Sequence, residues 1–219
     1  IFDYIDSDHN GKIEAEELLK LNHPGIVKTV GINYQSYKDP NKLSPSIMTE
    51  YFPKGSLKRN ITNNDFFHNS TQKYITLLGI SNAMNYLHHN NIIHGNLKPE
   101  NILYDNNNYP HISDFGLSQC FQSPNFQYSK LAIKGQINYI SPEKLINENC
   151  HDPSCDIYSF AMITYEIVTE KVPFFEFEGK ISDSELSEKV LSDYRPQFTE
   201  NVSEKMKGLI TKCWHSKVE

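Results

Sequence analysis

Apolar side chains recur every three or four residues between residues 77 and 87 and mark one face of a helix. They fall at Leu77, Ile80, Met84 and Leu87. This period is that of a half-buried helix, so the pattern predicts an amphipathic α-helix over residues 71–90. A pair of asparagines follows and ends the predicted helix.

A second apolar segment, Ile157 to Val168, is almost uninterrupted. A helix that is apolar on nearly all sides is normally buried, so we expect this segment to be a core helix. Smaller apolar groups at Val190–Leu191 and from Met206 to Trp214 predict further helices.

β-branched and apolar runs of strand length lie mainly before the predicted helices. Residues 26–32 and 47–51 predict strands, and the polar, proline-containing residues 33–45 predict a loop between them. Residues 102–104 and 111–113 predict two short strands around an Asn-rich turn. Strands followed by a mostly helical remainder indicate an α+β fold with segregated elements.

Composition and charge narrow the function classes. The chain has 219 residues, 38% hydrophobic and 22% charged, with a formal net charge of -6. An acidic chain lacks the basic field of most nucleic-acid-binding domains, so we expect no nucleic-acid partner. No apolar run approaches the roughly 18 residues of a membrane span. The N-terminus shows no basic region followed by an apolar stretch, so we expect no signal peptide.

The four cysteines do not have the spacing of a disulfide framework. Cys150 and Cys155 flank His151 and Asp152, a composition that a zinc site also shows. Free thiols in a surface loop are the favoured interpretation of this segment.

Two motifs in the middle of the chain carry its chemistry. Residues 94–101 read HGNLKPEN, and Asp114-Phe115-Gly116 begins thirteen residues after Asn101. The pattern H-R-D-x-x-x-x-N followed by D-F-G is the protein-kinase signature, which this chain resembles in order and spacing. It departs from the signature at Gly95, where the family has arginine, and at Asn96, where the family has the aspartate that serves as catalytic base.

The resemblance implies a role for each matching residue. Asp114 and Asn101 would bind Mg²⁺, and Lys98 would contact the transferred phosphate of ATP. Asn96 occupies the base position but carries a neutral amide, which donates hydrogen bonds and does not accept the hydroxyl proton.

The resemblance extends over most of the chain and implies a protein-kinase-like fold. Ser141-Pro142-Glu143 resembles the A-P-E motif, and DIYSF resembles the start of the buried helix of the large lobe. EYFPKGSL, DIYSF and Cys213-Trp214 together are similar to the tyrosine-kinase-like group, whose members mostly phosphorylate Ser or Thr. The residues that would line the adenine pocket are Thr49, Glu50, Phe52 and Leu103.

No Gly-rich loop precedes a lysine-bearing strand in the printed sequence. Counting back from His23-Pro24, Glu14 would be the glutamate of the small-lobe helix. We expect its lysine partner and the Gly-rich loop to lie before Ile1. The predicted organisation is an N-terminal loop merging into the small-lobe helix (1–22), the end of the small lobe and hinge (23–52), and the large lobe (53–219).

A second motif overlaps the predicted small-lobe helix. Residues 6–17 read DSDHNGKIEAEE and meet every specified position of the EF-hand pattern D-x-[DN]-x-[DN]-G-x₅-E. Carboxylate and carbonyl oxygens at these positions are the ligands that Ca²⁺ prefers. The candidate Ca²⁺ ligands are Asp6, Asp8, Asn10, Lys12 (through its carbonyl), Glu14 and Glu17.

Three functional hypotheses follow. The first is a catalytically impaired kinase-like domain that binds Mg²⁺ and ATP and regulates or scaffolds a signalling partner. The second is an active Ser/Thr kinase with protein substrates. The third is a Ca²⁺-binding module with a kinase-derived scaffold. The kinase resemblance implies a cytoplasmic, reducing setting.

Overall fold

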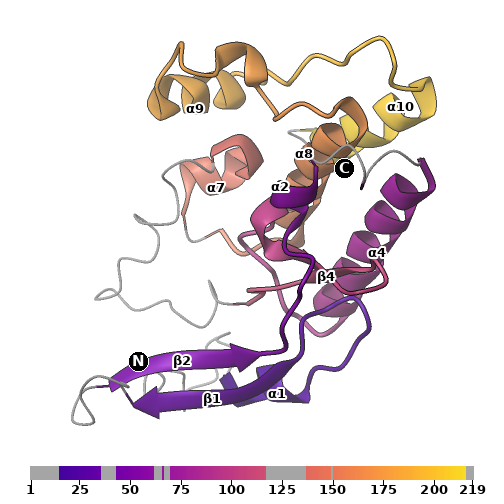
Figure 1. Cartoon of the computed structure of the whole chain (residues 1–219). Helices are drawn as coiled ribbons and strands as arrows, with labels where there is room; N and C mark the ends of the chain where they lie inside the picture. Colours follow the sequence, from indigo (N-terminus) through magenta and orange to yellow (C-terminus); the bar gives the residue numbers. More distant parts are fainter. Residues whose placement is uncertain are drawn as a thin grey trace.

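The structure, a computed structural model, describes residues 15–35, 43–61, 66, 70–116, 137–148 and 150–215. Two small antiparallel sheets and a set of helices make up this part of the chain. Strands β1 (Thr29–Gln35) and β2 (Leu43–Thr49) form one hairpin, with helix α1 (Ala15–Lys20) beside β1. This hairpin lies at one end of the molecule, and most of the helices lie beyond it (Figure 1).

The helical part begins after the first hairpin. Its second small sheet pairs β3 (Ile102–Tyr104) with β4 (Pro110–Ile112). The α-helices are α2 (Leu57–Asn60), α4 (Ser70–His89), α7 (Pro142–Ile146), α8 (Pro153–Thr169), α9 (Asp183–Leu191) and α10 (Glu204–Cys213), and the 3-10 turns are η2 (Pro99–Asn101), η3 (Ile137–Tyr139) and η4 (Phe175–Phe177). A strand hairpin set apart from a mostly helical part confirms the predicted α+β class.

The first two strands differ from their predicted bounds. β1 begins at Thr29, because Ile26 bridges to Ile112 of the second sheet and the Val27 N–H donates to the Ile112 carbonyl at 2.8 Å. The loop predicted over residues 33–45 is shorter, since its ends pair within the β1–β2 hairpin (Asn33 with Ser46, Gln35 with Leu43). These residues are strand because their backbones pair across the hairpin, although their polar side chains predicted a loop.

The predicted helices are confirmed, and α8 is longer than expected. Its N-cap is Asp152, whose carboxylate accepts from the Ser154 N–H at 2.8 Å, with Pro153 at the first helical position. It ends at Thr169, and the C-cap residue Glu170 has a left-handed backbone (φ 57). The apolar pattern marked only the buried middle of this helix.

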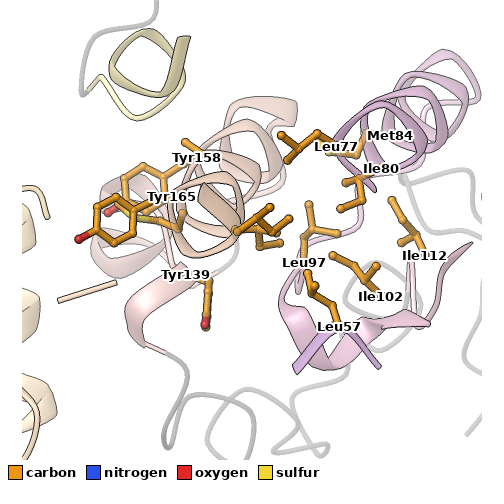
Figure 2. Packing of buried hydrophobic residues seen from close by; sticks show 14 of the residues in the cluster. Leu57, Leu77, Ile80, Met84, Leu97, Ile102, Ile112, Tyr139, Tyr158 and Tyr165 are labelled. Atoms are coloured by element: carbon orange, nitrogen blue, oxygen red, sulfur yellow. The ribbon is translucent and has the colours of Figure 1, made fainter. Parts of the chain in front are cut away.

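One core links α4, α8 and the second sheet (Figure 2). Gly79 of α4 packs directly against the Pro110 ring of β4, where a side chain of any size would collide. Burial of each large aliphatic side chain contributes about 1.5–3 kcal/mol. The labelled members of this core are Leu57, Leu77, Ile80, Met84, Leu97, Ile102, Ile112, Tyr139, Tyr158 and Tyr165.

Within the described residues, no helix combines the length and apolar character needed to cross a membrane.

Candidate active site

Residues 94–101 form a loop between α4 and β3, and its first residues are fixed by α8. The Asp156 carboxylate accepts from the backbone N–H of His94 and that of Gly95, both at 2.8 Å. His88, at the end of α4, places its Nε2 at 2.9 Å from the same carboxylate. Asp156 is 1% exposed, so these contacts form in the protein interior.

The charge state of this group follows from its partners. Burial alone would raise the pKa of Asp156, but the hydrogen bonds from His88, His94 and Gly95 outweigh burial and lower that pKa. Burial lowers the pKa of His94, so its ring is neutral at pH 7. The Asn96 N–H donates to His94 Nδ1 at 3.3 Å, which places the ring proton on Nε2.

Gly95 occupies a left-handed backbone conformation (φ 71), which glycine adopts at little cost. Its carbonyl accepts a hydrogen bond from the Lys144 ammonium of α7. Burial lowers the pKa of Lys144. The position where the kinase signature has arginine therefore contributes no side-chain charge, and a cation from α7 contacts its backbone.

The other end of the loop is joined to the second sheet. Asn101 is buried, and its Nδ2 donates to the Asn96 carbonyl at 2.9 Å. The Asn101 carbonyl accepts from Ser113 through its N–H at 2.8 Å and its hydroxyl at 3.2 Å. Because Asp114 follows Ser113, these bonds fix its backbone beside the loop.

Asp114 is exposed and has a left-handed backbone (φ 57). Burial lowers the pKa of Lys98, and the Glu100 and Asp114 carboxylates partly oppose that effect. Lys98 and Asp114 therefore lie within electrostatic reach of each other. The structure brings together Asn96, Lys98, Asn101 and Asp114, as the motif spacing predicts.

This set of side chains suits a metal–phosphate complex. Carboxylate and amide oxygens are the hard ligands that Mg²⁺ prefers, and an ammonium favours phosphate oxygens. Asp114 and Asn101 would bind the metal, and Lys98 would contact a phosphate.

The predicted adenine-pocket residues are only partly assembled. Phe52 is buried against the His111 ring, with ring centroids 4.7 Å apart, and Leu103 pairs with His111 across β3 and β4. Thr49 and Glu50 are exposed. The Glu50 carboxylate accepts from the Lys28 N–H at 2.9 Å, so it connects the residue after β2 to the residue before β1.

The predicted Ca²⁺ ligands cannot be placed. Asp6, Asp8, Asn10, Lys12 and Glu14 lie outside the described residues. Glu17 belongs to α1, but its side chain is not described.

The cysteines that the structure describes, Cys150, Cys155 and Cys213, are free thiols. No cluster of three or more His, Cys, Asp or Glu side chains within the described ranges is suited to a metal ion.

Sequence analysis missed two residues that contact this site. His88 lies on the helix end opposite Asp156, and Lys144 lies on α7 directly after Ser141-Pro142-Glu143. Neither belongs to a motif that predicts its contact, because both contacts join elements distant in the sequence.

Comparisons with known proteins agree with this geometry. The protein kinase domain profile matches residues 5–219. The chain is 33% identical over 220 residues to the probable serine/threonine-protein kinase gdt2 of Dictyostelium discoideum, covering 97% of this chain and 12% of that protein. It is 33% identical over 213 residues to serine/threonine-protein kinase 12 of Arabidopsis thaliana, covering 93% and 43%. A third relative, the dual specificity protein kinase pyk3 of Dictyostelium discoideum, is 30% identical over 214 residues, covering 97% and 15%. The chain thus spans less than half the length of these three relatives.

Proposed function

Because the chain belongs to the protein kinase family, we propose that it is a nucleotide-binding kinase domain with impaired phosphotransfer and a regulatory or scaffolding role. Kinase domains generally use ATP and Mg²⁺ and act on proteins. The observation that carries the proposal is Asn96 at the base position of an otherwise assembled loop.

Three side chains support retained nucleotide binding. Asp114 is exposed, and Lys98 lies near it. Asn101, at the end of the loop, is held by its bond to the Asn96 carbonyl. Bound Mg²⁺ would neutralise the charge of the ATP phosphates. The role of the chain's own residues is to bind and orient that complex.

Asn96 supports the loss of turnover. A carboxylate at this position accepts the proton of the substrate hydroxyl, whereas the Asn96 amide cannot. Loss of a general base lowers a rate by about 10²–10⁴-fold. The nucleotide would still bind, because no proton transfer is needed for binding.

Gly95 indicates that this domain is not controlled by phosphorylation in the way that the arginine of the kinase signature allows. An arginine at this position would pair with a phosphate on the following segment, as guanidinium groups do. Gly95 has no side chain, and the Lys144 ammonium is already bonded to its carbonyl. We therefore expect no activation through a phosphate bound at position 95.

Calorimetry with Mg·ATP tests the proposal. The wild-type chain should bind Mg·ATP, and Asp114→Ala should abolish the measured heat. Asp183→Ala, which removes an exposed carboxylate from α9, is the control and should bind like wild type. Absence of binding by wild type would contradict the proposal.

A rival proposal is an active Ser/Thr kinase, which the names of the relatives favour. It predicts phosphate transfer from Mg·ATP to a generic protein substrate that Asp114→Ala abolishes. If the domain is impaired, as we propose, wild type should transfer no more phosphate than the Asp114→Ala variant does. We place both forms in the tyrosine-kinase-like group on EYFPKGSL, DIYSF and Cys213-Trp214. The cytoplasmic setting is a proposal that rests on the kinase resemblance.

A Ca²⁺ role is a further proposal, which rests on the ligand pattern of residues 6–17. The exit helix of such a loop would be the small-lobe helix, so Ca²⁺ would act on the kinase lobe directly. Ca²⁺ should then raise the thermal midpoint of wild type but not that of Glu17→Gln. Identical midpoints with and without Ca²⁺ in both proteins would refute it.

A further inference from the structure

Two cysteines lie side by side where α7 leads into α8. Cys150 lies in the connecting loop, and its N–H donates to the Asn147 carbonyl at 2.8 Å. Cys155 lies in the first turn of α8, and its N–H donates to the Asp152 carbonyl at 3.0 Å. Their Sγ atoms are 3.6 Å apart.

This separation is close to bonding range. A disulfide has an S–S length of about 2.05 Å, so one sulfur must move by roughly 1.5 Å to bond the other. Cys150 is half-buried and belongs to a loop, whereas Cys155 is buried and belongs to a long helix. A small shift shared between the connecting loop and the first turn of α8 is sufficient to join them.

The surroundings favour reaction at Cys150. The Lys144 ammonium lies within electrostatic reach of both sulfurs. The thiolate is the reactive form of cysteine, and an exposed thiol meets an oxidant more readily than a buried one. Burial raises the pKa of Cys155 to about 11, so Cys150 is the better target for an oxidant and Cys155 the better resolving thiol.

The cysteine pair lies next to the groups that bind the first residues of the loop 94–101. This loop is called the catalytic loop below, and its front is His94 and Gly95. Cys155 directly precedes Asp156, which accepts the N–H groups of His94 and Gly95. Lys144, beside both sulfurs, donates to the Gly95 carbonyl. A displacement of the first turn of α8 therefore reaches residues 94 and 95 through direct hydrogen bonds.

We propose that Cys150 and Cys155 form a reversible disulfide under hydrogen peroxide, and that this bond loosens the front of the catalytic loop. The Cys150 thiolate attacks peroxide, forms a sulfenic acid and releases hydroxide, which takes up a proton to become water. The Cys155 sulfur then attacks the sulfenic sulfur, and the hydroxide that leaves takes up the Cys155 proton. In total, two thiols and one peroxide give one disulfide and two waters.

The bond acts on the loop through Asp156. Closure of the gap moves Cys155, and with it the carboxylate that accepts from residues 94 and 95. A misplacement of about 1 Å near reacting groups can lower a rate by about 10²-fold. The regulatory meaning rests on the proposed function, but disulfide formation and loop loosening do not depend on phosphotransfer.

Mass spectrometry and amide hydrogen exchange on the full chain test the two halves of the proposal. Peroxide should remove two hydrogen atoms from wild type, link the peptides of Cys150 and Cys155, and be reversed by dithiothreitol. The control Cys213→Ser, which removes a half-buried thiol on α10, should form the same link. Cys150→Ser should form no link. We choose it over Cys155→Ala because Cys150 is partly exposed, so its replacement disturbs the fold less than replacement of the buried Cys155.

Exchange at the His94 and Gly95 amides should become at least about tenfold faster in the oxidised wild type and stay unchanged in Cys150→Ser. Oxidation of Cys150 to a sulfinic acid without a link, or a link to another cysteine, would overturn the disulfide. A linked protein with unchanged exchange at these two amides would overturn its action on the loop.

Discussion

The two ends of the catalytic loop are fixed in similar ways but carry different chemistry. At the front, Asp156 accepts the N–H groups of His94 and Gly95. At the back, Asn101 donates to the Asn96 carbonyl and accepts from Ser113. The back carries the expected metal ligands and lysine, whereas the front has neither the arginine nor the base.

The difference shows how a kinase loop can keep its shape without its base. Asp156 and Lys144 contact backbone groups of His94 and Gly95. Residue 96 contributes its own backbone N–H, which donates to His94 Nδ1, so none of these contacts uses the Asn96 side chain. The carbonyl of residue 96 likewise binds Asn101 whatever side chain it has. The loop therefore needs the side chains of Asp156 and Asn101 to keep its conformation, but it does not need a particular side chain at position 96.

Removing Asp156 should have the largest effect on stability. Asp156→Ala leaves the buried N–H of His94, the half-buried N–H of Gly95 and the ring of His88 without their acceptor. We therefore expect the unfolding free energy to fall by about 3–5 kcal/mol. Chemical denaturation of both proteins measures it. The control Asp152→Ala, which removes the N-cap of the same helix, should cost only about 1 kcal/mol. Equal losses would show that Asp156 acts only through α8.

The same contact predicts a pH dependence. The folded pKa of Asp156 lies below the unfolded value, so its stabilisation is complete above about pH 4 and is lost as pH falls through the folded pKa. The difference in unfolding free energy between wild type and Asp156→Ala should therefore shrink between pH 6 and pH 2. A difference that stays constant over this range would contradict an ionised Asp156.

At the back of the loop, Asn101→Ala removes one hydrogen bond and one expected metal ligand. We expect a loss of about 1 kcal/mol in unfolding free energy and weaker Mg·ATP binding by calorimetry. Asn106→Ala, in the exposed turn between β3 and β4, is the matched control and should change neither. Loss of stability with unchanged Mg·ATP binding would leave Asn101 with a structural role alone.

Asn96→Asp should have the smallest effect on the fold. Because the contacts of residue 96 that fix the loop are made by its backbone, unfolding free energy should stay within about 0.5 kcal/mol of wild type. Thermal and denaturant unfolding check this. A loss near that of Asp156→Ala would mean that the loop has adapted to the amide.

The sequence predicted elements and motifs better than contacts between them. The period of apolar residues located α4 to within one residue at each end. The two motifs that the sequence singled out are joined in the fold by the bond from the Ser113 N–H to the Asn101 carbonyl, and the roles of Lys98, Asn101 and Asp114 stay predictions. The sequence misplaced β1, because Ile26 and Val27 pair with Ile112 in another sheet. The contacts of His88 and Lys144 depend on helices that meet only in the folded chain, which no local pattern reveals.

Phosphotransfer by Asn96→Asp, measured beside wild type with Mg·ATP and a generic protein substrate, tests the central claim most directly. The account predicts that the variant folds and binds nucleotide as wild type does and turns over about 10²–10⁴-fold faster. Equal turnover by two folded, nucleotide-binding proteins would contradict it, because the loss would then lie outside residue 96.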